Sequence, residues 1–195
     1  MNINQTPVQQ IKSWYRLNLS IDNAIKTNFV FPEIDKPAQI CIIDADEIFA
    51  TEWLTYMKNY NLIVEYALVF IRKSFQKDVS AHIDSTQYGK PMPVSLNWVH
   101  GIDDRDMVWY HTNSDELEYK TTYAGTRYYE APISELTEID RCRIGNQLTL
   151  VNTDTLHALA PGQHPRCCVT ARVLLDPDTT WAQFVEQHCH LLIER

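Results

Sequence analysis

The run LIVEYALVFI at residues 62–71 marks the point where the sequence changes character. It is rich in β-branched and aromatic residues, a composition typical of β-strands. Similar short runs follow as far as residue 175, and turn sequences such as Gly101-Ile102-Asp103-Asp104 and Gly145-Asn146 separate them. The further runs are VSAHID (79–84), VSLNWVH (94–100), DMVWYH (106–111), YKTTYAGTRYYEAP (119–132), QLTLVNT (147–153), LHALA (156–160) and RCCVTARVLL (166–175).

About eight strands separated by turns favour an antiparallel sandwich or barrel. Eight strands in two sheets form the jelly-roll, or double-stranded β-helix, arrangement. The sequence therefore predicts a mainly β protein with flanking helices (α+β) around a double-stranded β-helix core of the jelly-roll or cupin-like kind. The expected helices, each with its capping residue, are 21–28 (Ser20), 45–60 (Asp44) and 180–194 (Asp178 or Thr179).

A chain of 195 residues is long enough to bury a sizeable core and short enough for one domain. We expect residues 1–195 to form a single domain. Its parts are an N-terminal helical and loop support (1–61), the double-stranded β-helix core (62–175) and a C-terminal helix (176–195).

The net charge and the cysteine content limit which partners and which cellular compartment we expect for this protein. The net charge is −8, from 17 basic and 25 acidic residues, and no Lys/Arg run is present, which argues against a nucleic-acid partner. The five cysteines show no CxxC spacing, so we expect reduced thiols and a cytoplasmic location. The N-terminus has no apolar segment typical of a signal peptide, and no run approaches the ~20 apolar residues of a membrane helix.

His82-x-Asp84 is the first candidate for metal binding. On a strand, positions i and i+2 project to the same face, so an imidazole and a carboxylate placed this way can share one metal ion. The tripeptide alone is weak evidence, because seven His and 25 Asp and Glu give roughly one such pair by chance. A third ligand must come from elsewhere, and His157, at the start of another predicted strand, is the best candidate.

Arg166 follows His157 by nine residues. A planar guanidinium can hold a carboxylate through two parallel hydrogen bonds, which Lys cannot do. Arg172 is a rival, since it lies on the same face of the predicted strand but further from His157.

The order His82-x-Asp84, a long gap, His157 and then Arg166 resembles the Fe(II)/2-oxoglutarate-dependent oxygenases. The resemblance covers roughly residues 79–172. It implies that His82, Asp84 and His157 bind Fe(II), and that Arg166 binds the distal carboxylate of the co-substrate 2-oxoglutarate. The family pattern is Arg-x-Ser, whereas Cys168 stands two residues after Arg166 here. A thiol is a weaker donor than a hydroxyl, so either 2-oxoglutarate binds more weakly here or another hydroxyl, such as that of Thr149 or a tyrosine, helps to bind it.

The resemblance implies that dioxygen and 2-oxoglutarate react, with release of succinate and CO2, to hydroxylate an unactivated C–H bond. The acidic surface disfavours a nucleic-acid substrate and leaves small molecules, amino acids, peptides and protein side chains open, and the short chain slightly favours a small molecule. Asn97 shares a strand face with Ser95 and is a candidate to contact 2-oxoglutarate or substrate, although a structural role fits it equally well. The tyrosine-rich segment between the two halves of the triad (Tyr119, Tyr123, Tyr128 and Tyr129) either shapes substrate choice or forms an ordinary strand pair.

Two other readings stay open. A cupin-type metal enzyme would use the same three ligands without an oxo acid and would not need Arg166. A non-catalytic β-sandwich would bind a sugar or a peptide and leave His82 and Asp84 as surface residues. The acidic segment 103–106 is expected to be an ordinary hairpin turn rather than a calcium loop, because it lacks the twelve-residue spacing. The identity of the substrate and the oligomeric state stay open.

Overall fold

Two antiparallel sheets and a few short helices make up the part of the chain that the structure describes, so the predicted mainly β architecture is confirmed. The computed structural model describes residues 11–33, 38–73, 80–84, 92–113, 117–121 and 127–193, and the side chains of residues 119 and 127 are not described. Tyr123 lies outside this part of the chain. No helix within it is both long enough and apolar enough to cross a bilayer.

The larger sheet has seven strands. In spatial order these are β13 (Leu192–Ile193), β1 (Trp14–Leu17), β10 (Thr149–Asn152), β5 (Val94–His100), β12 (Arg166–Val173), β3 (Val64–Arg72) and β2 (Ala38–Asp44).

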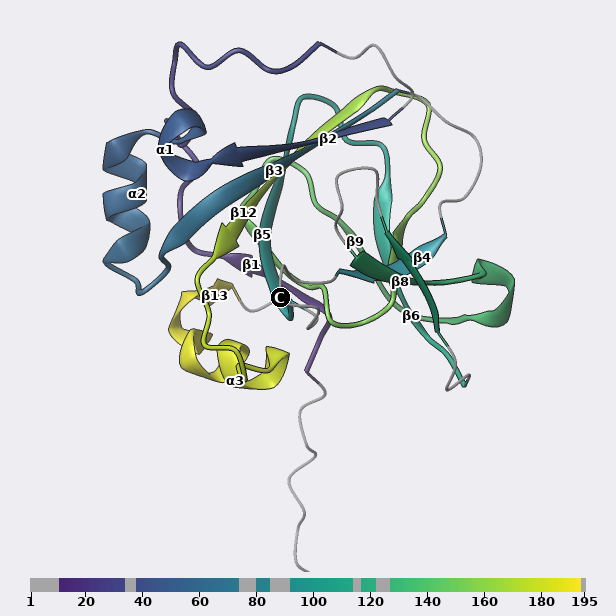
Figure 1. Cartoon of the computed structure of the whole chain (residues 1–195). Coiled ribbons are helices and arrows are strands. Elements are labelled where there is room, and N and C mark those ends of the chain that lie inside the picture. The colour runs from purple at the N-terminus through teal and green to yellow at the C-terminus, as the bar shows by residue number, and fades with distance from the viewer. Residues whose placement is uncertain are drawn as a thin grey trace, which may run out of the picture.

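The smaller sheet has six strands and lies on the other side of the molecule from the helices (Figure 1). In spatial order these are β7 (Glu118–Thr121), β8 (Arg127–Ala131), β4 (Ala81–Asp84), β11 (His157–Leu159), β6 (Asp106–His111) and β9 (Thr137–Arg143).

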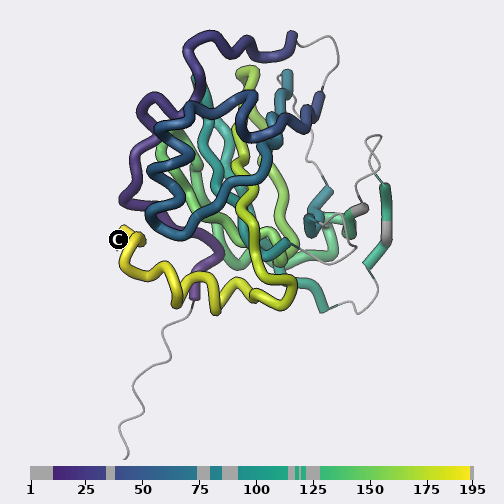
Figure 2. Tube along the Cα trace, turned by 60° about the vertical axis from the view of Figure 1, so that its left-hand side comes forward, coloured from purple at the N-terminus to yellow at the C-terminus, as the bar shows by residue number. Residues whose placement is uncertain are grey.

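The chain crosses repeatedly from one sheet to the other. β3, β5, β10 and β12 belong to the larger sheet, whereas β4, β6, β9 and β11 belong to the smaller one. Each crossing returns the chain beside a strand that is distant in sequence, so β4 becomes the neighbour of β11 and β5 the neighbour of both β10 and β12. The tube in Figure 2 follows this path from the N-terminal to the C-terminal segments.

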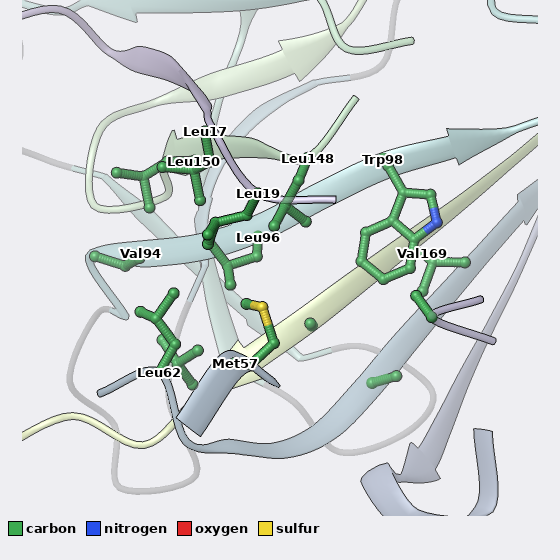
Figure 3. Packing of buried hydrophobic residues seen from close by; sticks show 14 of the residues in the cluster. Leu17, Leu19, Met57, Leu62, Val94, Leu96, Trp98, Leu148, Leu150 and Val169 are labelled. Atoms are coloured by element: carbon green, nitrogen blue, oxygen red, sulfur yellow. The ribbon is translucent and has the colours of Figure 1, made fainter. Parts of the chain in front are cut away.

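The larger sheet is buried on both faces. Val94, Leu96 and Trp98 of β5 pack in the main core on the helical side, together with Met57 of helix α2 (Thr51–Lys58) (Figure 3). The alternate residues of β5 face the smaller sheet, where Val99 joins a second apolar cluster. A strand buried on both faces reads as a continuous run of buried residues, and residues 94–99 do so.

The helix predicted over residues 45–60 is divided in two. α1 (Ala45–Ile48) and α2 are separated at Phe49, which has an extended backbone and forms an isolated bridge with Ile25. Phe49 is fully buried against Trp53, so its packing outweighs helix continuity. The helix predicted over residues 21–28 is wrong, because that segment forms turns around the same bridge.

The C-terminal helix is shorter than predicted. α3 (Trp181–Gln187) is capped by Thr180 rather than by Asp178 or Thr179, in a capping box with Gln183. A 3-10 turn η2 (Cys189–Leu191) and β13 follow it, and a second 3-10 turn, η1 (Ile133–Glu135), precedes β9.

The predicted set of about eight strands omits β1, β2, β9 and β13, and the run at 119–132 divides into β7 and β8. β2 and β9 are edge strands with few buried residues, so their sequences lack the apolar signal. The hairpin turn expected at 103–106 is wrong, because that segment joins β5 and β6, which lie in different sheets.

Leu96 tests the assignment of the main core. Leu96→Ala removes a fully buried side chain at the centre of the larger sheet and should lower the free energy of unfolding by about 2–5 kcal/mol. Ile42→Ala, at a side chain of edge strand β2 that is 55% exposed, should change it by less than about 0.5 kcal/mol. Urea denaturation measures both values, and equal effects would contradict this core.

Candidate metal centre

His82 and His157 lie directly opposite each other on neighbouring strands β4 and β11. Their ring centroids are 4.6 Å apart. The alternation of β4 points His82 and Asp84 into the space between the sheets. Ala81 lies on the opposite face and packs with Ala158 in a small apolar cluster, which fixes the register of the two short strands.

Asp84 completes a group of three ligands. Its Oδ1 lies 3.7 Å from His82 Nε2 and 3.9 Å from His157 Nε2. One ligand atom from each residue lies within 4.8 Å of the other two. The exposed fractions of the side chains are 28% for His82, 20% for Asp84 and 6% for His157, so the group is largely buried but reachable.

Backbone carbonyl groups orient both imidazoles. His157 Nδ1 lies 2.9 Å from the carbonyl oxygen of Thr155, and His82 Nδ1 lies 3.3 Å from that of Ser80. A carbonyl oxygen only accepts, so each Nδ1 carries the proton and donates it. The Nε2 lone pairs therefore face the carboxylate of Asp84, which is the tautomer that a metal ligand requires.

The electrostatics keep protons off Asp84 and His157 near neutral pH. Burial and the neighbouring charge of His82 lower the pKa of His157 to about 4. Burial would raise the pKa of Asp84, but the charges of Arg172, His157 and His82 outweigh it and lower that pKa to about 2. Asp84 and His157 thus offer lone pairs that carry no proton near neutral pH, and a cation that joins them stabilises such a pair.

The donor set fits a divalent transition metal. Two imidazoles and one carboxylate that leave positions open are the ligands of non-haem Fe(II) oxygenases, and catalytic zinc uses similar groups. Ligand atoms about 2.1 Å from a metal lie about 3.0–3.4 Å apart, depending on the coordination geometry. The observed 3.7 and 3.9 Å need only a small contraction around an ion. His82, Asp84 and His157 therefore form a group that can hold a metal.

Arg172 of β12 holds the second oxygen of Asp84. Its Nη2 donates to Oδ2, while Oδ1 faces the two imidazoles. This contact crosses from the larger sheet to the smaller one and fixes the orientation of the carboxylate. A partner of this kind beyond the ligands determines ligand geometry and affinity.

A cavity of about 80 Å³ opens beside the triad, which is several times the space that one water molecule needs (~10–15 Å³). It brings together every site residue predicted from the sequence: His82, Asp84, His157, Arg166, Asn97 and Cys168. The remaining lining residues are Phe70, Arg72, Ser95, Met107, Thr153, Ala158, Leu159, Thr170 and Arg172.

Arg166 lies at the start of β12 and is held by Asp103. Its Nε donates to Asp103 Oδ1 at 3.0 Å, and the two side chains are 7% and 4% exposed. Asp103 also accepts hydrogen bonds from the backbone N–H groups of Arg105 and Gly145. The segment expected to be a plain turn thus holds Arg166, a residue of the cavity wall, in place.

The loop before β12 is closely packed against this segment. Asp104 accepts hydrogen bonds from the backbone N–H groups of Gln163 and His164, and fully buried Arg105 donates to the carbonyl of His164. A Cβ on Gly162 would lie 2.3 Å from the side chain of Arg105, so only glycine permits this approach.

The hydroxyl-bearing residues predicted from the sequence differ in how near they lie to the cavity. Thr149 Oγ1 donates to the carbonyl of Gln147 and does not line the cavity, whereas Thr170, two residues after Cys168, brings a hydroxyl into it. Tyr128 lies edge-on to His82 with ring centroids 6.2 Å apart, which places one tyrosine of the predicted segment beside the triad.

The sequence did not identify Ser95 or Asp103 as residues of the site, and it ranked Arg172 behind Arg166 as the arginine that binds a carboxylate. Arg172 had one usable signal, its shared face with Arg166 on the same strand. Asp103 had none, because its role depends on a loop that packs against a strand 63 residues away. No protein-family model matches the chain, and a search of curated proteins finds no relative.

The pKa of His157 predicts how the stability of the metal-free protein depends on pH. The unfolded state binds a proton near pH 6.5 and the folded state only near pH 4, so the free energy of unfolding should fall as the pH drops through this window. The loss should be on the order of 3 kcal/mol, since each pKa unit corresponds to about 1.4 kcal/mol. Below about pH 4, protonation of Asp84 should extend the loss.

Chemical denaturation in the presence of a chelator measures this dependence. His157→Gln should flatten the curve between pH 6.5 and 4, whereas His111→Gln, at an exposed histidine outside the triad, should leave it unchanged. An unchanged slope in His157→Gln would show that other groups cause the acid sensitivity.

The three ligands predict the metal stoichiometry. The purified protein should bind one equivalent of Mn(II), Co(II) or Zn(II), and His82→Ala, Asp84→Ala or His157→Ala should each weaken binding by at least about 100-fold. His111→Ala is the matched control and should bind normally. Elemental analysis and Co(II) absorption measure this, and full occupancy in all three variants would rule out the site.

Proposed function

We propose that this protein is an Fe(II)- and 2-oxoglutarate-dependent oxygenase that hydroxylates a small molecule, an amino acid or a peptide. The observation that carries the proposal is the convergence of His82, Asp84 and His157 beside a cavity that also contains Arg166. Two imidazoles and a carboxylate leave three positions of Fe(II) open, which suits a chelating oxo acid and dioxygen.

The strand order supports a double-stranded β-helix. The strands β10-β5-β12-β3 belong to one sheet and β4-β11-β6-β9 to the other, and we assign this set to the eight strands of a jelly roll. The ligands come from the second and seventh strands of this set along the chain, and Arg166 begins the last. The insertion β7–β8 lies beside the strand that carries His82 and Asp84.

The end of the cavity at Arg166 suits the distal carboxylate of 2-oxoglutarate. Asp103 holds the Nε of Arg166 and so fixes the guanidinium against the cavity wall. Cys168 and Thr170 follow on the same strand face, with Cys168 Sγ 4.0 Å from Thr170 Oγ1. Thr170 supplies the hydroxyl that Cys168 lacks at the position where the family has serine.

Fe(II) at this site would supply the centre at which 2-oxoglutarate chelates and dioxygen is reduced. In the overall reaction one oxygen atom enters succinate, the other becomes the new hydroxyl group, and CO2 leaves. The protein's own residues orient and shield the reactants. Arg166 binds the co-substrate, Arg172 orients Asp84, and apolar Phe70 and Met107 limit water in the cavity.

Arg166 tests the assignment of the co-substrate. Under anaerobic conditions with Mn(II), the wild-type protein should bind 2-oxoglutarate, and Arg166→Ala should weaken that binding about 10–100-fold while retaining the metal, because a charge-assisted pair is lost. Asp84→Ala should instead lose the metal. Under aerobic conditions with Fe(II), 2-oxoglutarate turnover, scored as succinate, should follow the same division.

Arg166→Lys is the second variant, because it keeps a positive charge against buried Asp103 while removing the planar fork. If neither substitution alters 2-oxoglutarate affinity or turnover, a cupin-type metal enzyme that uses no oxo acid becomes the better description. Absence of 2-oxoglutarate binding by the metal-loaded wild type would overturn the proposal.

A further inference from the structure

Three buried side chains bring polar atoms without a partner to the cavity. Within the part of the chain that the structure describes, four buried polar atoms at the cavity make no hydrogen bond. They are Oγ of Ser95, Oδ1 of Asn97, and Nε and Nη1 of Arg172. The three residues are between 0% and 7% exposed. A buried polar group without a hydrogen bond is unfavourable, so the concentration of these atoms in one cavity indicates a binding site that a ligand completes.

These atoms belong to the end of the cavity that holds the metal ligands. Arg172 touches Asp84 directly through Nη2, so its other two nitrogens lie next to the triad. In the pairing of β5 with β12, Thr170 lies opposite Asn97 and Ala171 lies opposite Leu96. One residue further along each strand, Ser95 therefore lies level with Arg172. Donors from β12 and acceptors from β5 therefore lie side by side on the same wall.

Arg166 lies six residues away on the same strand and already has Asp103 as a partner. The distal carboxylate of 2-oxoglutarate is separated by two methylene groups from the atoms that chelate a metal. Arg172 contacts a metal ligand itself, so it is too near the metal to receive that distal group. The two arginines thus suit two different anions.

The charges at the metal end require a second anion. A divalent ion, the carboxylate of Asp84 and the guanidinium of Arg172 sum to two positive charges, because an imidazole that binds a metal is neutral. The chelating carboxylate of an oxo acid cancels one of them. The remaining charge lies in a buried cavity, where an unpaired charge is costly and a bound anion is favoured.

We propose that Arg172 binds the carboxylate of the primary substrate and that Asn97 and Ser95 accept hydrogen bonds from its amino group, which makes the substrate a small free α-amino acid. This inference rests on the proposed function and names its substrate class. The cavity of about 80 Å³ suits a small ligand. A guanidinium beside two acceptors matches the carboxylate and the ammonium group on neighbouring atoms of an amino acid.

The test uses the full chain with saturating Mn(II) and 2-oxoglutarate in the absence of oxygen, so that no turnover is needed. Calorimetric titration with the free L-amino acids should identify at least one that binds. Its α-amide, which lacks the negative charge, should bind at least tenfold more weakly. In Arg172→Gln that holds one equivalent of Mn(II), binding of the acid should weaken to the level of the amide, while the Kd for 2-oxoglutarate should rise by a smaller factor than the Kd for the acid.

Arg143→Gln is the matched control, because it makes the same change at an exposed arginine outside the cavity and should alter neither Kd. Arg172→Lys keeps the charge and should bind the acid with intermediate affinity. Metal content is measured for each variant. If Arg172→Gln does not fold, the wild-type comparison of acid and amide, together with Arg172→Lys, decides the question.

The outcomes separate the two proposals. Failure of the Mn(II)-loaded protein to bind 2-oxoglutarate overturns the proposed function and this inference with it. If 2-oxoglutarate binds but no amino acid does, or if acid and amide bind equally, the inference fails while the proposed function stands. If Arg172→Gln loses 2-oxoglutarate and keeps its metal, Arg172 belongs to the co-substrate and the inference is wrong.

Discussion

The carboxylate of Asp84 is the point on which the site depends. Its Oδ1 faces the Nε2 atoms of His82 and His157, and its Oδ2 accepts from Arg172 on the opposite sheet. A buried ion pair gains little net stability over an apolar pair of the same shape, because both charges lose their hydration. The pair is therefore explained better by what it orients than by what it stabilises. The ion pair holds Oδ1 of Asp84 at the position where it faces the imidazoles of both His82 and His157.

The two faces of β12 have different roles, and this difference makes the buried contact between Arg172 and Asp84 possible. Cys167, Val169, Ala171 and Val173 face the helices and belong to the main core or contact it, whereas the alternate residues, from Arg166 to Arg172, face the cavity. Most apolar burial of the larger sheet thus occurs on its helical side, where Met57, Trp53 and Phe184 cover it. The inner face can then carry two arginines, a thiol and a hydroxyl without loss of the fold.

The predictable part of this protein is the part with a strong local period. Residues 94–100 and 106–111 have a pattern of apolar residues strong enough to predict the bounds of two strands to the residue. His82 and Asp84 share a face because strands have a period of two. β9 has one fully buried residue in seven, so its sequence resembles a surface segment. Phe49 breaks a helical pattern through a bridge to Ile25, a contact between distant segments. The pairing of His157 with His82 likewise comes from the topology, and the sequence supplied only the order of the ligands.

Asp103 and Arg172 show why the rest of the site was not predictable. Each acts through a partner 63 or 88 residues away, and neither partner follows from composition or spacing. What distinguishes the metal end of the cavity is also invisible in sequence, since the sequence does not tell that Ser95, Asn97 and Arg172 bring polar atoms without a hydrogen bond to one cavity. Natural proteins satisfy most buried polar groups, and local exceptions concentrate where a ligand completes the set. The unfavourable free energy of these atoms is offset by the core on the other face of the same strands, so that the cavity is ready before any ligand arrives.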